Sequence, residues 1–596
     1  MSYVAPVKDM LFVMEHLADI EQVAKIPAFE DAGLDTAQAV LEEAAKFNEG
    51  VLAPLNWEGD KYPSSWHDGK VTATPGFKEA HRQFAEAGWQ GLQHPAEFGG
   101  QGLPKTIGAA VGEMQNSANM SFALCPLLSD GAIEALLTAG SPELNAVYLE
   151  KLVSGQWTGT MNLTEPQAGS DLAMVRSRAE PQPDGSYKIS GTKIFITWGE
   201  HDLTDNIVHL VLARVTGAPE GVKGISLFVV PKFLVNKDGS LGARNDVHCV
   251  SIEHKLGIKA SPTAVLQFGD HGGAVGYLVG QENRGLEYMF IMMNAARFGV
   301  GVQGIAIAER AYQKAVNFAR ERVQSRPVDG SLPGSAPIIH HPDVKRMLMT
   351  MRATVQGCRS MALVAAAAYD AAHNHPDPAV RKPNQAFYEF MVPLIKGYST
   401  EMSLEVTSLG VQVHGGMGFI EETGAAQYYR DAKILTIYEG TTAIQANDLV
   451  GRKTARDGGQ TAKAIAGQIE RTEADLVANG SADALAVARR LKAAREAFVQ
   501  VVDFVAGNTK ASPNAVFAGS VPYLMLAGNL MAGWQLGRAL LVAQSQIAAG
   551  KDVAFMQAKV VTARFYADHM LTKVPGLRDA VLEGADSVTA LALDLF

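Results

Sequence analysis

Hydrophobic residues recur every three to four positions up to about residue 155, a spacing typical of amphipathic helices. The stretch His94–Pro104, HPAEFGGQGLP, is rich in glycine and proline, so it predicts a loop within this helical zone. From Trp157 the pattern changes to short runs of β-branched residues, of which Ile207–Val215 and Ile225–Val230 are the clearest. Residues 157–280 are therefore predicted to form a β domain.

Turn residues support the strand assignment. Pro183-Asp184-Gly185 predicts a tight turn just before a strand that begins at Tyr187. Another strand is expected to end at Thr164 and to lead into a loop.

The helical spacing returns near Gly285 and continues to the end of the chain. A polar stretch after Arg452 predicts a linker, and the alanine-rich remainder predicts a further helical domain. We expect an α+β multidomain protein with a helical domain at 1–156, including an N-terminal extension over about 1–40. The β domain at 157–280 follows, then a helical bundle at 281–452 and an additional helical domain at 453–596.

Composition narrows the class of protein. Of 596 residues, 47% are hydrophobic and 19% are charged, which is typical of a globular chain. The net charge of −10 argues against a generally basic, nucleic-acid-coating surface. Three cysteines without metal-ligand spacing predict neither a disulfide framework nor a metal site. The most apolar stretch, 521–543, contains Asn, Gln and Arg and predicts a buried helix, so we expect no membrane span and no targeting segment.

Two segments of the β domain contain candidate ligand-binding residues. Thr158–Asp171, TGTMNLTEPQAGSD, predicts a loop whose main-chain N–H groups and hydroxyls suit a phosphate or a polar heterocycle, although ordinary turns share this composition. Gly191–Gly199, GTKIFITWG, places Phe195 and Trp198 near the end of a strand. An aromatic ring there suits stacking on a planar cofactor, but core packing is the commoner role.

Two further segments lie in the helical bundle. Val411–Phe419, VQVHGGMGF, has paired glycines that allow close approach of a ligand or end a helix, and it does not fit the dinucleotide fingerprint. Ile437–Gln445, IYEGTTAIQ, carries Glu439 at an expected break before a helix. That carboxylate is either a helix N-terminal charge or, next to apolar surface, a proton-abstracting base.

The four segments, in this order on a helical–β–helical frame, resemble the acyl-CoA dehydrogenase family over roughly residues 60–452. The long chain, the segment Glu253–Asp270 and the extra C-terminal helices resemble most closely the 3-methylmercaptopropionyl-CoA dehydrogenase-like branch. The resemblance implies an N-terminal helical domain, a middle β-barrel-like domain, a C-terminal four-helix bundle and an additional helical domain.

The resemblance also implies the chemistry. The family uses FAD to oxidise an acyl-CoA thioester to its trans-2-enoyl product, as in fatty acid β-oxidation. By similarity Glu439 is the general base that removes the α-proton, while the β-hydrogen leaves as hydride to flavin N5. The thioester oxygen is held by a flavin ribityl hydroxyl and the main-chain N–H of Glu439. Some branches of the family carry their base near Arg297. This chain has no carboxylate there, and this strengthens the assignment of Glu439 as the base.

Contacts to ligands are carried over by the same resemblance. The residues that match the flavin and pyrophosphate side are Met161, Leu163, Thr164, Ser170, Phe195 and Thr197. Those that match the adenosine side, partly across a subunit interface, are Arg322, Gln412, Gly415, Gly416 and Thr441. Substrate contacts are expected at Ser170, Tyr438, Gly440 and Arg297.

Three positions depart from the family pattern. Phe195 replaces a common tryptophan and loses an N–H donor, and Ala443 replaces a Gln or Glu that commonly contacts FAD. Val323-Gln324-Ser325 replaces the usual Thr-Phe-Gly after Arg322. These changes indicate a divergent branch that retains the chemistry.

Partners and alternatives complete the prediction. We expect an acyl-CoA substrate, electron-transferring flavoprotein as acceptor, a homodimer and a cytoplasmic location. One alternative is an FAD-containing, DNA-associated alkylation-response homologue, which is disfavoured because the region from Lys453 onward is close to neutral. The other alternative is an acyl-CoA oxidase, which differs in oxygen access and is left open by the sequence. The acyl chain of the substrate is also left open.

Overall fold

A computed structural model describes residues 3–596 of the chain. The fold divides into two compact units. One consists of Met1–Ala45, Pro104–Ser117 and Val300–Phe596, and the other of Lys46–Leu103 and Ala118–Gly299. We call them the helical unit and the β unit. Helices α6 (Lys105–Ala139) and α8 (Gly285–Glu321) each run from one unit into the other, and α6 has non-helical backbone angles at Asn119, next to this boundary.

The β unit contains an eight-stranded mixed sheet in the order β10-β11-β5-β12-β7-β6-β3, and β4 pairs with both β5 and β6. Because β4 joins two strands that lie three places apart, the strands β5, β12, β7, β6 and β4 close into a ring. The expected β-barrel-like domain is thereby confirmed. The strands are β3 (Thr158–Asn162), β4 (Arg178–Pro181), β5 (Tyr187–Thr197), β6 (Ile207–Val215), β7 (Ser226–Pro231), β10 (Val247–Ile252), β11 (Thr263–Phe268) and β12 (Ala274–Val279).

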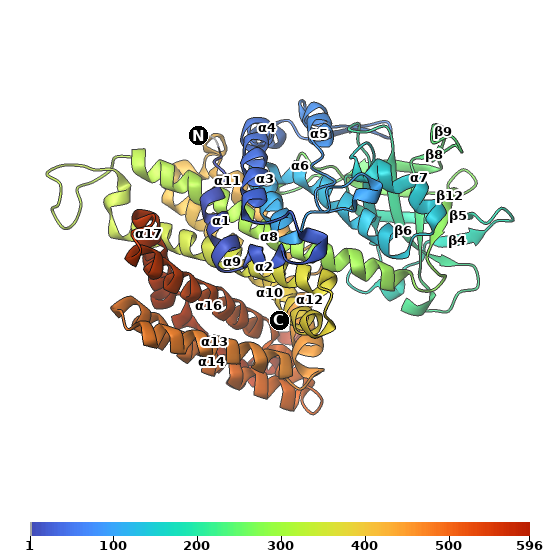
Figure 1. The fold of residues 1–596 in the computed structure, drawn as a ribbon. Coiled ribbons are helices and arrows are strands. Elements are labelled where there is room, and N and C mark those ends of the chain that lie inside the picture. The colour runs from blue at the N-terminus through green and yellow to red at the C-terminus, as the bar shows by residue number, and fades with distance from the viewer. Residues whose placement is uncertain (1–2) are drawn as a thin grey trace. The chain divides into compact units, whose positions relative to one another are not determined.

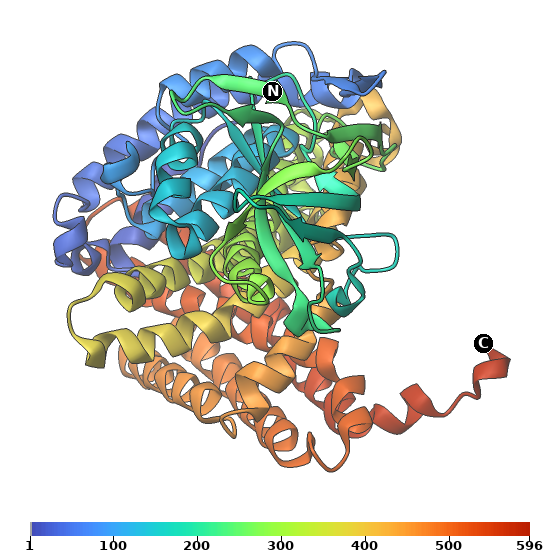
Figure 2. The ribbon, with the colours of Figure 1, turned by 90° about the vertical axis from the view of Figure 1, so that its right-hand side faces the viewer.

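The predicted turn at residues 183–185 joins β4 and β5, which pair antiparallel. The two β-branched runs form β6 and β7, whose residues are almost all buried. Figure 2, turned by 90° from the view of Figure 1, shows the strands of this sheet in front, in green and blue-green. A separate hairpin, β8 (Phe233–Val235) with β9 (Leu241–Arg244), lies outside this sheet.

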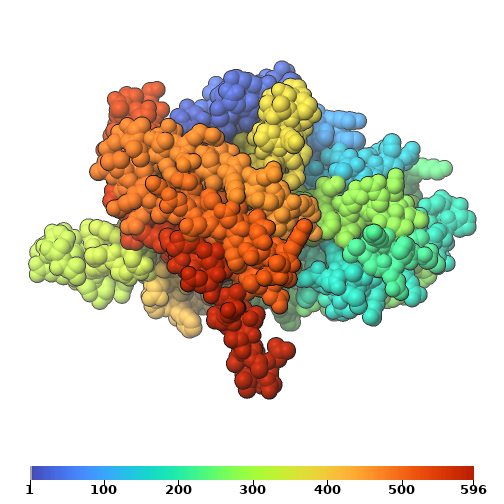
Figure 3. Space-filling model, turned by 90° about the horizontal axis from the view of Figure 1, so that it is seen from below, coloured from blue at the N-terminus to red at the C-terminus, as the bar shows by residue number. Residues whose placement is uncertain are grey.

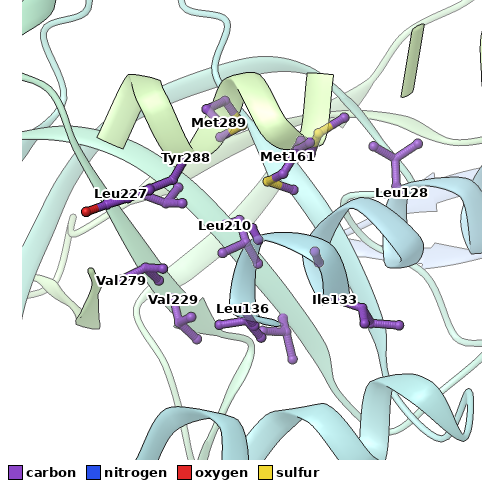
Figure 4. Close-up of a cluster of buried hydrophobic side chains, with 14 of the residues drawn as sticks. Leu128, Ile133, Leu136, Met161, Leu210, Leu227, Val229, Val279, Tyr288 and Met289 are labelled. Atoms are coloured by element: carbon purple, nitrogen blue, oxygen red, sulfur yellow. The ribbon is translucent and has the colours of Figure 1, made fainter. Parts of the chain in front are cut away.

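Helices accompany the sheet in the β unit. They are α4 (Pro54–Lys61), α5 (Phe77–Glu86), α7 (Pro142–Val153), the second part of α6 and the first part of α8. Of these, α6, α7 and α8 form a core with β3, β6 and β7, and Figure 4 shows part of it, where Leu136 and Ile133 of α6 lie near Leu210 of β6 and Met161 of β3. The N-terminal zone, expected to be helical, also holds the hairpin β1 (Ser65–His67) and β2 (Lys70–Thr72), because Gly69 adopts the positive φ that its tight turn requires.

The helical unit is built around long helices. These are the second part of α8, α9 (Pro342–Asn374) and α10 (Pro378–Val413), followed by α11 (Ala425–Ala432) and α12 (Thr442–Asp448). Glycines let α8 approach α10 closely, since a Cβ at Gly301 would come within 2.5 Å of Ile395. Two short helices, α1 (Val7–His16) and α2 (Ile20–Val23), contact α9, and α3 (Leu34–Phe47) follows.

The C-terminal helices belong to the same unit. They are α13 (Gln460–Asn479), α14 (Ala482–Asn508), α15 (Pro513–Ala518), α16 (Ser520–Ala548), α17 (Val553–His569), α18 (Val574–Glu583) and α19 (Ala585–Thr589). Helix α16 lies between α13–α14 and α9–α10 (Figure 1), and it contacts α9, α10, α14 and α17. It contains the apolar stretch 521–543, so the prediction of a buried helix is confirmed. The end of the chain projects from these helices (Figure 3).

Two helices in the described residues, α6 and α8, are long and apolar enough to cross a membrane. Most of each apolar stretch is buried within the folded chain, as is usual for long apolar helices in a protein core. The polar stretch expected to be a linker after Arg452 begins as a π-helix over Leu449–Ala455 and ends in a turn at 456–459 before α13, and within it Thr454 is buried with its hydroxyl 2.8 Å from that of Tyr523.

Candidate functional site

Glu439 lies in a left-handed turn between α11 and α12. Its φ is 54°, and the φ of the next residue, Gly440, is 89°. Residues other than glycine rarely adopt positive φ. Each such residue costs about 1–3 kcal/mol of conformational free energy and persists only where its surroundings hold it. Thr441 then starts α12 as its N-cap, with its hydroxyl accepting from the Ile444 N–H at 3.3 Å. The expected break before a helix is therefore a strained turn with Glu439 at its centre.

A lysine and a glutamine of the helical unit hold this turn. Lys396 on α10 is fully buried, and its Nζ donates to the main-chain oxygens of Leu435 and Gly440, each at 2.7 Å. The Nε2 of Gln445 donates to the carbonyls of Glu439 at 3.3 Å and Gly440 at 3.2 Å. The sequence analysis missed both residues. A lysine within the apolar run of α10 is the signal that marks Lys396 as a side chain with buried partners.

Tyr438 points its hydroxyl into the helical unit. The hydroxyl donates to the amide oxygen of Gln303, and the Gln303 Nε2 donates to Asn116 at 3.0 Å. Burial, together with the charge of the neighbouring Glu439, raises the pKa of Tyr438 well above its usual value. The phenol therefore stays protonated and acts as a donor next to the carboxylate.

Four of the five residues expected at the adenosine side lie at the adjoining ends of α8 and α10, and the fifth, Thr441, is the N-cap of α12. The Phe318 and His414 rings, one on each helix end, have centroids 4.4 Å apart. Arg322 is exposed just beyond α8, and its main-chain oxygen accepts from Ile338 at 2.8 Å. Gln412, Gly415 and Gly416 are exposed around the end of α10, and a Cβ at either glycine would meet nothing within 4 Å.

A small cavity of about 160 Å³ lies next to these helix ends. Arg310 and Lys314 supply its positive charge, and burial, with Arg310 nearby, lowers the pKa of Lys314. The other lining residues are Gln313, Asn317, Phe318, Glu321, His414, Thr423 and Tyr428.

Phe195 in the β unit lies on a β-bulge. The register of β5 against β11 pairs Ile196 with Ala264 and Lys193 with Leu266, so two residues of β5 oppose one of β11. Phe195 is one of these two, has φ of 59°, and leaves its side chain 60% exposed. A bulge of this kind redirects a side chain out of the sheet. Thr197, two residues on, pairs with Thr263 and is half-buried.

The loop that follows β3 is attached to this bulge. The Ile194 N–H donates to the carbonyl of Thr164 at 2.9 Å. The buried Lys193 donates to the carbonyl of Leu163 at 3.0 Å and to the Glu165 carboxylate at 2.8 Å. Burial raises the pKa of Glu165. The Lys193 ammonium and hydrogen bonds from the following loop lower it by more, so the pKa falls to about 2. The structure therefore brings Leu163 and Thr164 next to the bulge, although β3 ends at Asn162 rather than at the expected Thr164.

Three further predicted site residues of the β unit lie away from the bulge contacts just described. Met161 is buried, and its side chain belongs to the core shown in Figure 4. Ser170 is exposed in the loop after β3. Arg297 is buried on α8 and has no carboxylate beside it in the sequence. Trp198, the other aromatic of the motif, is fully buried against Phe77 and is a core residue.

The predicted residues therefore form two groups. The flavin-side residues and Arg297 lie on the β unit, and Glu439, with the adenosine-side residues, lies on the helical unit. Within each group, hydrogen bonds or ring contacts tie the supporting segments together.

Four family models match consecutive parts of the chain. They describe the acyl-CoA dehydrogenase N-terminal domain at 35–156, the middle domain at 160–271, the C-terminal domain at 283–453 and an acetyl-CoA dehydrogenase C-terminal-like domain at 462–592. Together they cover most of the chain, including the C-terminal helices.

Characterised relatives match over the full length. The chain is 54% identical to 3-methylmercaptopropionyl-CoA dehydrogenase of Ruegeria pomeroyi, with 100% of both chains covered. It is 35% identical to a broad-specificity linear acyl-CoA dehydrogenase of Mycobacterium tuberculosis over 97% of each chain. In fold, it matches an acyl-CoA dehydrogenase complexed with FAD from Bacillus anthracis with a TM-score of 0.74 at 21% identity, over 96% of this chain and 92% of that one. This chain belongs to the acyl-CoA dehydrogenase family, whose shared activity is the FAD-dependent dehydrogenation of acyl-CoA thioesters.

Proposed function

We propose that this enzyme dehydrogenates 3-methylmercaptopropionyl-CoA at its α,β-bond, with Glu439 as the general base. The observation that carries the substrate assignment is the 54% identity to a dehydrogenase of that name over the whole length of both chains. The relative with broad specificity for linear acyl-CoA is more distant, at 35%. Short thioether acyl-CoA is therefore favoured over long fatty acyl-CoA as the main substrate.

The geometry of the turn supports Glu439 as the base. Lys396 and Gln445 hold the main-chain carbonyls of Leu435, Glu439 and Gly440, so the carboxylate is presented from a rigid position. Removal of the α-proton places negative charge on the thioester oxygen, and we assign the main-chain N–H of Glu439 as one donor to that oxygen. The Tyr438 hydroxyl, held by Gln303, keeps the adjacent residue in place.

The residues present fit FAD. Phe195 offers an exposed ring on the bulge, and the space around Gly415 and Gly416 is open at the other group. When bound, FAD supplies the acceptor for the β-hydrogen as hydride. We propose that Met161 (through its main chain), Leu163, Thr164, Ser170, Phe195 and Thr197 hold the flavin and pyrophosphate, that Arg322, Gln412, Gly415, Gly416 and Thr441 hold the adenosine half, and that Ser170, Tyr438, Gly440 and Arg297 contact the substrate.

A panel of acyl-CoA thioesters tests the substrate. The purified flavoprotein is mixed anaerobically with each thioester, and the loss of visible flavin absorbance is followed. Pentanoyl-CoA is the matched control, since it replaces the sulfur of the proposed substrate with a methylene. We expect the thioether substrate to give a kcat/KM about tenfold or more above that for octanoyl-CoA, because a pocket of fixed size discriminates by about 1–3 kcal/mol. Faster reduction by octanoyl-CoA would reassign the enzyme to fatty acyl chains.

The electron acceptor and the assembly are part of the same proposal. We propose electron-transferring flavoprotein as the acceptor, a homodimer in the bacterial cytoplasm, and no association with DNA. Peroxide formed at the turnover rate would instead favour an oxidase, and salt-dependent binding to duplex DNA would revive the alkylation-response alternative. Light scattering that gives a tetramer would contradict the dimer.

The domain limits are proposed at 156/157, 280/281 and 452/453. The helices after residue 453 pack on α9 and α10, which supports a role in covering the surface of the bundle. Limited proteolysis followed by mass spectrometry tests these limits, because cuts are expected near them and a cut pattern confined to other segments would contradict them.

A further inference from the structure

Three potential metal ligands meet on the β unit, where the sequence analysis predicted no metal site. Asp246 precedes β10, and His248 is the second residue of that strand. His271 lies in the turn between β11 and β12, and the Gly269 N–H donates to the carbonyl of Asp246 at 2.9 Å. This bond and the pairing of His248 with Gln267 bring the turn against the start of β10. The contact joins residues more than twenty positions apart, so only the Asp-x-His spacing was visible in the sequence.

The three side chains converge on one point. The Asp246 Oδ1 lies 3.2 Å from the His248 Nε2 and 3.2 Å from the His271 Nδ1. All three ligand atoms lie within 4.8 Å of one another. Around Zn²⁺ with bonds of about 2.0–2.1 Å, tetrahedral ligand atoms stand about 3.3 Å apart. Two of the three separations already match that value, and the exposed His271 ring is free of core packing that would prevent the third from closing.

The supporting contacts orient the carboxylate. The other oxygen of Asp246, Oδ2, accepts from the main-chain N–H groups of His271 at 2.7 Å and Gly273 at 3.1 Å. Positive φ at Gly272 and Gly273 lets the turn present both N–H groups. The Oδ1 atom is thereby left facing the two imidazoles. Hydrogen bonds from protein to a ligating carboxylate are the usual way in which a metal site is pre-oriented.

Asn245, which precedes Asp246 in the sequence, fixes the main chain that carries the site. The Asn245 Nδ2 donates to the carbonyls of Pro231 and Val275, each at 2.9 Å, and its Oδ1 accepts from the Val275 N–H at 2.9 Å. This ties the start of β10 to the neighbouring strands. The two histidine rings cross at 84° with centroids 5.4 Å apart, so they do not stack and both can turn a nitrogen to a common centre.

We propose that Asp246, His248 and His271 bind one divalent transition-metal ion, with Zn²⁺ as the ion of best fit. Two imidazoles and a carboxylate suit Zn²⁺ and Cu²⁺ better than Mg²⁺ or Ca²⁺, which take oxygen ligands. Because the site is exposed, water completes the coordination. Binding displaces any proton on the two facing nitrogens, so the metal replaces the hydrogen bonds that the histidines make to Asp246.

The site is separate from the flavin-side residues of the β unit. On β5 the residues near it are around Gly191, which pairs with Phe268, whereas Thr197 pairs with Thr263 at the other end. The ion therefore braces β10 and the 269–273 turn, and it takes no part in dehydrogenation.

Metal titration of the full-length flavoprotein tests the proposal. After treatment with a chelator and dialysis, calorimetry with Zn²⁺ is expected to show one site per chain. Cu²⁺ is expected to give an electron paramagnetic resonance spectrum with splitting from two imidazole nitrogens. His271→Ala and His248→Ala should each weaken binding by about 10-fold or more, whereas the exposed His67→Ala should leave it unchanged.

The outcomes separate a metal site from a hydrogen-bonded cluster. Zn²⁺ should also raise the thermal midpoint of the wild type, and a chelator should reverse the rise. Absence of stoichiometric binding, or equal binding by the His248→Ala/His271→Ala double variant, would overturn the proposal. Because His271 is 77% exposed and His248 is 43% exposed, these variants are expected to fold.

Discussion

Two functional candidates, Phe195 and Glu439, share an uncommon property, since each is a large side chain with positive φ. Such backbone conformations persist only where neighbours fix them, and they concentrate at functional sites. At Phe195 the fixing comes from a bulge, and at Glu439 it comes from buried side chains of α10 and α12. The motifs in the sequence identified both residues, but the strain and the groups that hold it depend on tertiary contacts and could not be predicted.

Lys396 is expected to position Glu439 through the carbonyls of Leu435 and Gly440. Lys396→Met should lower the rate of acyl-CoA-driven flavin reduction by about 10–100-fold, because small displacements of a reacting group cost this much. The visible flavin spectrum should be retained, and KM should change little. The control is Lys382→Met, which removes an exposed lysine of the same helix. Equal rates for the two variants would contradict the positioning role.

At the level of elements, the strands were easier to predict than the details that make the site. The boundaries of β6 and β7 follow from β-branched runs, and the turn at 183–185 follows from its residue types. The hairpin β1–β2 was missed because it is short and exposed, so hydrophobic alternation gives little signal. The shift of register that exposes Phe195 was also missed, because it depends on how β11 pairs with β5.

The loop at 94–104 is attached to α6 by His94. Its Nε2 lies 2.8 Å from the Asp130 carboxylate, and its Nδ1 lies 3.5 Å from that of Glu134. Burial lowers the pKa of His94, but the hydrogen bonds and charges of the two carboxylates outweigh it and raise the pKa to about 9. The folded protein therefore holds this proton more tightly than the unfolded chain, whose histidine pKa is about 6.5.

This shift gives a pH-dependent stability. The contribution of His94 is fully present below about pH 6.5 and is lost as the pH rises through about 9. Because the carboxylates are partly exposed, we expect a loss on the order of 2 kcal/mol. The difference in unfolding free energy between wild type and His94→Gln should shrink by this amount between pH 6 and pH 10. Urea unfolding of the two full-length proteins measures it. Parallel pH profiles for the two proteins would contradict the assignment.

Across the whole chain, segments far apart in sequence meet at one buried charge cluster of the helical unit. Arg359 on α9 donates to Asp9 of α1 at 2.6 Å, to Glu309 of α8 at 2.7 Å, and also to Glu113 of α6. Lys559 of α17 pairs with the same Asp9. Composition and periodicity predicted the helices but not this cluster, since each charged residue alone is compatible with a solvated helix face.

Removal of the central arginine should destabilise the helical unit. Arg359→Met removes the partner shared by three carboxylates, of which Asp9 keeps its pair with Lys559, and loss of one partner from a buried ion pair costs about 3–5 kcal/mol. Differential scanning calorimetry should show a lower unfolding midpoint for this variant than for Arg346→Met. The latter removes a 49% exposed arginine of the same helix. Equal midpoints would show that the cluster adds no stability.

The central claim is that Glu439 is the base of an FAD-dependent acyl-CoA dehydrogenase. The most direct measurement is anaerobic stopped-flow reduction of the bound flavin, with wild type and Glu439→Gln mixed with the same acyl-CoA that reduces the wild type. The variant should keep its yellow flavin and lose the rate of bleaching by a factor of about 10³ or more, since a general base contributes about 10²–10⁴. Bleaching at the wild-type rate by Glu439→Gln would contradict the assignment.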